Sequence, residues 1–194
     1  MNKINIAVIV GSTRKDRFSR TAADWIAAEL TKNESIEVSL LDLRDYSMPF
    51  FDADTSPMVK QEPFEHESVQ KFTAEIDKAD GFVFVTPEYN HGTSAVLKNA
   101  LDWVYPEWNE KPAAFVGYGN AGGARAIEQL RQVVIELQMA PISAAVHIAG
   151  HDFFPVQFGG APADEMFANY SDKADAMINQ LLRWAQALKQ MREG

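Results

Sequence analysis

In three segments of the sequence, polar, basic and glycine residues follow an apolar run. The first, residues 11–20, reads GSTRKDRFSR after the apolar run 4–10, and it offers hydroxyl, backbone N–H and guanidinium groups. Such groups bind phosphate where a helix begins, and Arg14 could bind it through two hydrogen bonds. The other segments, residues 87–92 (PEYNHG) and 117–122 (GYGNAG), combine polar atoms with glycines that let the backbone approach a flat ring closely. Together the three segments predict a site for a planar molecule that carries a phosphate.

The basic residues of segment 11–20 stand out against an acidic chain. The formal net charge is -9, so an anionic ligand would need local positive groups such as Arg14 and Arg17 to hold it. Ser12 and Ser19 add hydroxyl groups, and Ser19 is predicted to cap the following helix. The simpler interpretation is a solvated basic loop with a serine cap. The segment has neither the spacing nor the Lys-Ser/Thr ending of a triphosphate-binding loop.

The other two segments each allow a plainer interpretation. Residues 117–122 match the pattern G-x-G-x-x-G, but the next strand lacks the acidic residue of a dinucleotide site, because it reads PISA from Pro141. A small-residue loop beside a flat ring, or a tight turn before a helix, explains the glycines. In residues 87–92, Tyr89 could serve packing alone, and His91 either contacts the ligand or caps the turn. The other histidines lack a metal-site pattern and no acid–base pair stands out, so neither a metal ligand nor a catalytic side chain is predicted.

These segments need a scaffold of alternating strands and helices to bring them together. Apolar, β-branched runs predict strands, and a 3.6-residue period predicts helices. The predicted strands are 4–10, 36–43, 82–85, 113–116 and 142–148, and the predicted helices lie at 18–31, 69–79, 97–104, 123–139 and 174–188. Right-handed crossovers then give an α/β fold with helices on both faces of a parallel sheet, and five strands favour the flavodoxin-like order 2-1-3-4-5. Ligands bind at the carboxyl ends of such strands, where all three segments fall.

Length and composition are typical of a globular protein. The 194 residues suggest a single domain over residues 1–194, and 46% hydrophobic with 23% charged residues argue against disorder. The net charge of -9 disfavours nucleic acid and anionic membranes as partners. No apolar run is long enough to span a bilayer. The lack of cysteine fits a cytoplasmic protein. Residues 44–64 and 149–163 read as long loops. Trp103 and Trp108 are expected in the core or in a subunit interface.

The motifs resemble those of the NADPH-dependent FMN reductase family, whose members include flavodoxin-like quinone, azo-dye and chromate reductases. The matching stretches are 11–14 (GSTR), 86–92 (TPEYNHG), 97–103 (LKNALDW) and 122–131 (GGARAIEQLR), within a similarity that covers about residues 4–148. The resemblance implies an FMN-dependent NAD(P)H oxidoreductase with FMN and NADPH as cofactors. It also implies a homodimer or homotetramer with each flavin near a subunit boundary.

The resemblance further assigns roles to individual residues. Those expected at the FMN phosphate are Ser12, Arg14 and Ser19, with Arg17 as an additional contact to the phosphate or to NADPH. Those expected along the isoalloxazine ring are Pro87, Glu88, Tyr89 and Asn90, with Gly119 near the pyrimidine end of the ring. His91, in the same loop, is a further candidate contact to the cofactor.

The activity implied by the resemblance is hydride transfer from NADPH to flavin N5 and on to an acceptor. Candidate acceptors are a quinone, an azo compound, a metal oxyanion or free flavin, and the cofactor rather than a side chain carries the chemistry. One alternative is a flavodoxin-type electron carrier without NAD(P)H oxidase activity of its own, which would suit the acidic chain but not an arginine at the phosphate. Another is a flavin-poor domain of the same fold that binds partners.

Overall fold

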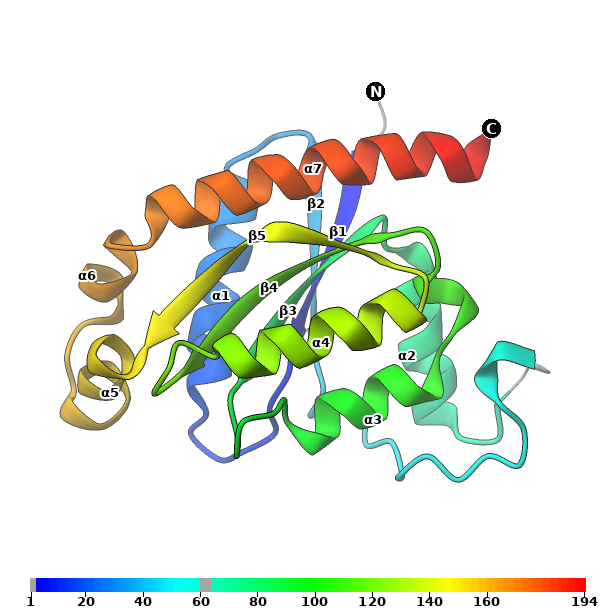
Figure 1. Ribbon diagram of the computed structural model, residues 1–194, viewed down its shortest axis with the longest axis horizontal. Helices are drawn as coiled ribbons and strands as arrows, with labels where there is room; N and C mark the ends of the chain where they lie inside the picture. Colours follow the sequence, from blue (N-terminus) through cyan, green and yellow to red (C-terminus); the bar gives the residue numbers. More distant parts are fainter. Residues whose placement is uncertain (1–2, 60–63) are drawn as a thin grey trace.

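A sheet of five parallel strands runs through the computed structural model, which describes residues 3–59 and 64–194. The strands are β1 (Ile4–Val10), β2 (Ile36–Asp42), β3 (Gly81–Pro87), β4 (Pro112–Gly119) and β5 (Ala140–Ala149). Their order is β2-β1-β3-β4-β5, and every neighbouring pair is parallel (Figure 1). The predicted flavodoxin-like topology is therefore confirmed.

Helices cover both faces of the sheet (Figure 1). The α-helices are α1 (Phe18–Thr31), α2 (Glu67–Lys78), α3 (Ala95–Trp103), α4 (Ala124–Glu136), α5 (Gly150–Gly159), α6 (Ala163–Ala168) and α7 (Ser171–Glu193), and the connections contain the 3-10 helices η1 (Pro57–Val59) and η2 (Pro106–Trp108). Helices α1 and α7 pack on one face, and α2, α3 and α4 pack on the other. Within residues 3–59 and 64–194, none of the helices has both the length and the apolarity to cross a membrane.

The central strands are buried on both faces because nearly all of their side chains are apolar. In β3, Val83 and Val85 contribute to the core beneath α1 and α7, whereas Phe82 and Phe84 contribute to the core beneath α2, α3 and α4. Successive side chains of a strand point to opposite faces, so a strand with two covered faces needs an unbroken apolar run. Trp108 packs against Phe82 with 4.7 Å between ring centroids and is fully buried, which places it in the core.

The structure contradicts the loop predicted at residues 149–163, because most of this segment forms α5. Its glycine and proline residues suggested a loop, but here they shape a helix. Gly160 ends α5 in the left-handed conformation with φ 72°, and the Ala161 N–H donates to the Pro155 carbonyl at 3.1 Å. Phe153 buries the inner face of α5 in the core under α1 and α7. Tertiary packing therefore outweighs the local composition.

The other predicted loop, residues 44–64, is attached to α3, and its residues 60–63 lie outside the described part of the chain. The Pro49 carbonyl accepts hydrogen bonds from Trp103 Nε1 at 2.9 Å and from Asn99 Nδ2 at 2.8 Å. Asn99 Oδ1 in turn accepts the Phe51 N–H at 2.9 Å. Trp103 is 2% exposed and so belongs to the core, which is one of the two places predicted for it; the other was a subunit interface. These contacts hold the loop against α3.

Lys111, just before β4, is a buried lysine that should make stability depend on pH. Its Nζ donates to the carbonyls of Ile76 and Asp77 at the end of α2, both at 2.9 Å. Burial lowers the pKa of Lys111 to about 8, against 10.5 for an ordinary lysine. Between these values the unfolded chain binds more protons than the folded protein, so this group makes the free energy of unfolding rise with pH.

Urea unfolding of the wild type and of Lys111→Met, from about pH 7 to about pH 11, measures this contribution. We expect the free energy of unfolding of the wild type to rise relative to that of the variant as the pH increases from about 8 to 10.5. Parallel curves for the two proteins would show that Lys111 has the same pKa in the folded and unfolded states.

Candidate functional site

The loops after β1, β3 and β4 surround a pocket with a volume of about 290 Å³. Its walls come from the three segments that the sequence singled out and from α5. The predicted site residues that line the pocket are Arg14, Arg17, Pro87, Glu88, Tyr89 and Gly119. The parallel topology therefore brings the three segments together at one edge of the sheet, as the sequence predicted.

Ser12 connects the first segment to the second. Its side chain is buried, and its Oγ lies 3.0 Å from the Tyr89 hydroxyl. The same Oγ accepts the Arg14 N–H at 3.4 Å, and Arg14 Cζ lies 5.7 Å from the centre of the Tyr89 ring. A hydroxyl, a phenol and a guanidinium group are thus adjacent, although they come from two different loops.

Helix α1 begins without a side-chain cap. Arg17 occupies the N-cap position, so the prediction that Ser19 caps this helix is wrong; Ser19 lies in the first turn instead. Ser19 is fully buried, and its hydroxyl interacts with the Tyr118 phenol. A helix start without a side-chain cap presents unpaired N–H groups at the positive end of the helix dipole. These N–H groups fit an anion such as phosphate, which could accept their hydrogen bonds.

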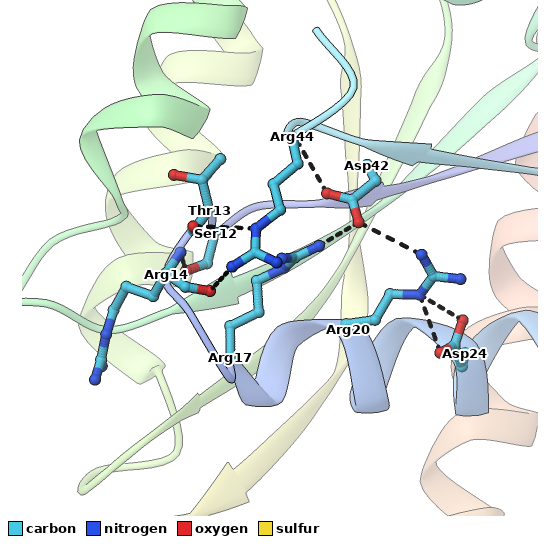
Figure 2. A network of polar contacts seen from close by, with 8 residues as sticks. All are labelled: Ser12, Thr13, Arg14, Arg17, Arg20, Asp24, Asp42 and Arg44. Atoms are coloured by element: carbon cyan, nitrogen blue, oxygen red, sulfur yellow. Dashed lines mark hydrogen bonds and ion pairs between the residues drawn. The ribbon is translucent and has the colours of Figure 1, made fainter. Parts of the chain in front are cut away.

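Arg17 lines the pocket, but its guanidinium group points to Asp42 at the end of β2 (Figure 2). The two side chains form an ion pair and are only 5% and 7% exposed. Arg20 also reaches Asp42, at 3.4 Å, and binds Asp24 through its Nε at 2.9 Å. Breaking a buried ion pair leaves a charge without compensation, so Asp42 holds Arg17 in this orientation. The contact predicted between Arg17 and the phosphate or NADPH stays a prediction.

Asn90 and His91 form the tip of a tight turn after β3. The N–H groups of Tyr89 and Gly92 donate to each other's carbonyls at 2.9 and 3.0 Å, and Asn90 and His91 have φ angles of 49° and 69°. Two successive left-handed residues are typical of a type I′ turn, in which the second position is usually glycine. A histidine there costs about 1–2 kcal/mol, and such strain is concentrated at functional sites.

Arg125 at the start of α4 holds the side chains of both Glu88 and His91. The Glu88 carboxylate accepts Arg125 Nε–H at 2.7 Å and the Arg125 backbone N–H at 3.0 Å. Burial by itself would raise the pKa of Glu88. These hydrogen bonds and the Arg125 charge outweigh burial and hold the pKa of Glu88 below its usual range. His91 Nε2 lies 2.9 Å from Arg125 Nη1, and because a guanidinium group only donates, Nε2 accepts and the ring proton is on Nδ1. The ring contact predicted for Glu88 and the cofactor contact predicted for His91 stay predictions.

Gly119 keeps the second and third loops close together. The Glu88 N–H donates to the Tyr118 carbonyl at 2.9 Å, which extends the pairing of β3 and β4 beyond the strands. A Cβ atom at residue 119 would lie 3.0 Å from the Glu88 Cβ, so any side chain there would crowd the pocket wall. Gly119 therefore lets the two loops approach each other closely, whereas the predicted approach of this backbone to a flat ring stays a prediction.

Sequence reasoning missed the aromatic wall of the pocket. Tyr118 and the α5 residues Phe153, Phe154 and Phe158 line it. Tyr118 packs edge-on against Phe153, with 5.5 Å between ring centroids. Gln157 Nε2 donates to the Asp16 carbonyl at 2.6 Å and so connects α5 to the first loop. The clustered phenylalanines of residues 153–158 were the available signal, but the neighbouring glycines and proline favoured a loop.

Comparison with known proteins identifies the family. The model of the NADPH-dependent FMN reductase family matches residues 4–153. An NAD(P)H-dependent FMN reductase of Schizosaccharomyces pombe, C4B3.06c, is 37% identical over 143 residues, which cover 73% of this chain and 72% of the relative. A 2-hydroxy-1,4-benzoquinone reductase of a Burkholderia species is 32% identical over 176 residues, covering 86% and 90% of the two chains.

A solved structure with a similar fold is also that of an NAD(P)H-dependent oxidoreductase. FerB, a flavoenzyme NAD(P)H:(acceptor) oxidoreductase of Paracoccus denitrificans, superimposes with a TM-score of 0.71 at 26% identity, over 93% of this chain and 98% of FerB. These relatives are reductases, which favours the enzyme over the alternative of an electron carrier. The resemblance carried by the sequence motifs is thus confirmed, and the chain belongs to the NADPH-dependent FMN reductase family.

Proposed function

We propose that this protein is an FMN-dependent NAD(P)H oxidoreductase that reduces small planar acceptors. The observation that carries the proposal is the start of α1, which has no side-chain cap and follows directly on the pocket residues Arg14 and Arg17. Unpaired N–H groups at a helix start, next to an arginine, favour a bound phosphate. The family supports FMN as the molecule that carries this phosphate.

In this proposal the first loop binds the FMN phosphate. Ser12, Ser19 and the N–H groups of the first turn of α1 donate hydrogen bonds, and Arg14 supplies the positive charge. Arg14 is well suited to this role because its guanidinium group can donate two parallel hydrogen bonds to one phosphate. The net charge of -9 works against anion binding elsewhere, so this local charge also directs the phosphate to the correct end of the pocket.

The second and third loops would hold the isoalloxazine ring. Pro87, Tyr89 and Gly119 line the pocket, and the strained turn at Asn90 and His91 directly follows Tyr89. Tyr118 also lines the pocket, and burial raises the pKa of its phenol, which interacts with Ser19 of α1. When bound, FMN supplies the redox chemistry, accepting a hydride from NAD(P)H and passing reducing equivalents to the acceptor. The protein binds and orients the planar groups, and no side chain is assigned as a catalytic acid or base.

The names of the relatives support a quinone as the acceptor. Azo compounds, metal oxyanions and free flavin are the further candidates. The basic first loop favours NADPH over NADH, since it could also bind a 2′-phosphate. Three exposed apolar residues in one loop, Phe50, Met58 and Val59, favour a homodimer or homotetramer in which they are covered. The lack of cysteine favours the cytoplasm as the compartment.

Binding and turnover assays test the function directly. The purified protein should bind FMN, quench its fluorescence, and oxidise NADPH in the presence of a benzoquinone with ping-pong kinetics. NADH, azo dyes, chromate and free flavin in the same assay rank the donors and acceptors. A protein that binds FMN but oxidises neither nucleotide would be an electron carrier, and a protein that binds no FMN would contradict both functions.

Tyr89→Ala should change the absorption bands of bound FMN. The substitution removes an aromatic ring from the pocket wall, and with it the packing against the isoalloxazine edge. Tyr89→Phe is the control, because it keeps the ring and loses only the hydroxyl that contacts Ser12. We expect the wild-type spectrum for Tyr89→Phe and a shifted one for Tyr89→Ala. Identical spectra for the wild type and Tyr89→Ala would remove Tyr89 from the flavin site.

A further inference from the structure

A cluster of charged side chains lies at the carboxyl end of β2, beside the first loop (Figure 2). Asp42 is its centre and is 5% exposed. Its Oδ2 accepts hydrogen bonds from Arg17 and Arg20, and its Oδ1 accepts the Arg44 backbone N–H at 3.0 Å. Asp42 therefore fixes the chain at Arg44, two residues beyond the end of β2, relative to α1.

From this position the Arg44 side chain reaches across to the first loop (Figure 2). Its Nε donates to the Thr13 carbonyl at 3.2 Å, and its Nη2 donates to the Arg14 carbonyl. The two carbonyls belong to successive peptide groups of the loop. One guanidinium group thus holds two neighbouring peptides from the β2 side, which requires the planar fork of arginine.

The orientation of these carbonyls determines where the loop's N–H groups point. In a trans peptide the C=O and the N–H point in opposite directions. With the Thr13 and Arg14 carbonyls turned toward Arg44, the N–H groups of Arg14 and Lys15 face the other way. The Arg14 N–H indeed donates to Ser12 Oγ, which also contacts the pocket residue Tyr89. Figure 2 shows the side chain of Arg14 extending away from Asp42.

We infer that Arg44 is a positioning residue that orients the peptide groups of the first loop for binding the flavin phosphate. The inference rests on the proposed function, since it deepens the role of that same site. Arg44 acts through the loop backbone: it satisfies two carbonyls on the outer side. On the inner side, the Lys15 N–H and the Ser12 hydroxyl that receives the Arg14 N–H are therefore already aligned when the phosphate arrives. A loop that is preorganised in this way binds its anion more tightly than one that must first be ordered.

The test compares FMN with riboflavin, which lacks the phosphate, by quenching of flavin fluorescence. Arg44→Met removes the guanidinium group, and Arg44→Lys keeps the charge but not the fork. Arg20→Met is the matched control, because it removes the same charge from the same cluster while its partners are Asp24 and Asp42. We expect both Arg44 variants to bind FMN at least about tenfold more weakly and riboflavin within about threefold of the wild type, and Arg20→Met to bind both flavins within about threefold.

Other outcomes overturn the inference. Equal losses for FMN and riboflavin would mean that Arg44 only supports the fold, and an equal loss in Arg20→Met would mean that general charge is responsible. Arg44→Lys keeps the test decisive if Arg44→Met fails to fold. If the wild type binds no FMN, the proposed function fails together with the inference. If the wild type binds FMN and both Arg44 variants bind it equally well, only the role of Arg44 fails.

Discussion

Arg14→Ala is expected to weaken FMN binding by about 1.5–3 kcal/mol, the range for hydrogen bonds to a charged group, which corresponds to a dissociation constant roughly ten to two hundred times higher. Arg14 lines the pocket beside Tyr89, and its backbone N–H already belongs to the polar cluster around Ser12. The remaining phosphate ligands in the proposal are neutral. The loss of the guanidinium group therefore removes the one positive side chain that attracts the phosphate in this proposal.

Titration of the apoprotein with FMN, followed by fluorescence quenching, measures this effect. Lys15→Ala is the control: it removes one positive charge from the adjacent position, but Lys15 is not among the residues that line the pocket. Its effect should be small and should disappear at high salt, because exposed charges are screened. An unchanged dissociation constant for Arg14→Ala, or equal effects of the two substitutions, would contradict the assignment of Arg14 to the phosphate.

Gly123→Ala should destabilise the protein by about 2–4 kcal/mol, because the new side chain has neither the backbone conformation nor the space it needs. Gly123 is the N-cap of α4 and has a φ of 70°. A Cβ atom there would lie 2.7 Å from the Tyr118 nitrogen and 2.8 Å from the Gly117 carbonyl carbon, and both are backbone atoms that cannot move without displacing β4. The third loop and the start of α4 would have to shift together.

Urea unfolding monitored by circular dichroism compares Gly123→Ala with Gly159→Ala. Gly159 is the better control among the glycines, because a Cβ there meets nothing within 4 Å and its φ is not in the left-handed region. We expect a much lower midpoint for Gly123→Ala with an unchanged slope, and a midpoint near that of the wild type for Gly159→Ala. If the two variants unfold at the same denaturant concentration, the contacts around Gly123 do not limit stability.

The fold could be predicted from the sequence because its signals are local. β1 and β3 are apolar on both faces, and only a buried strand of a parallel sheet requires that pattern. Once strands alternate with helices, the handedness of the crossovers leaves few possible strand orders, and each loop at a strand's carboxyl end must lie at the same edge. The meeting of Ser12 with Tyr89, which are 77 residues apart, follows from this topology.

Only the tertiary structure decided which charged partners the polar side chains of the pocket bind. Arg17 and Glu88 line the pocket, and their predicted contacts with the ligand stay predictions. The Arg17 guanidinium group binds Asp42, 25 residues away, and the Glu88 carboxylate binds Arg125, 37 residues away. Both choices depend on which opposite charge the packed backbone brings within hydrogen-bonding distance, and no local pattern of residues encodes that distance. α5 shows the same limit for secondary structure, because burial of Phe153 in the core stabilises a helix that its glycines and proline disfavour.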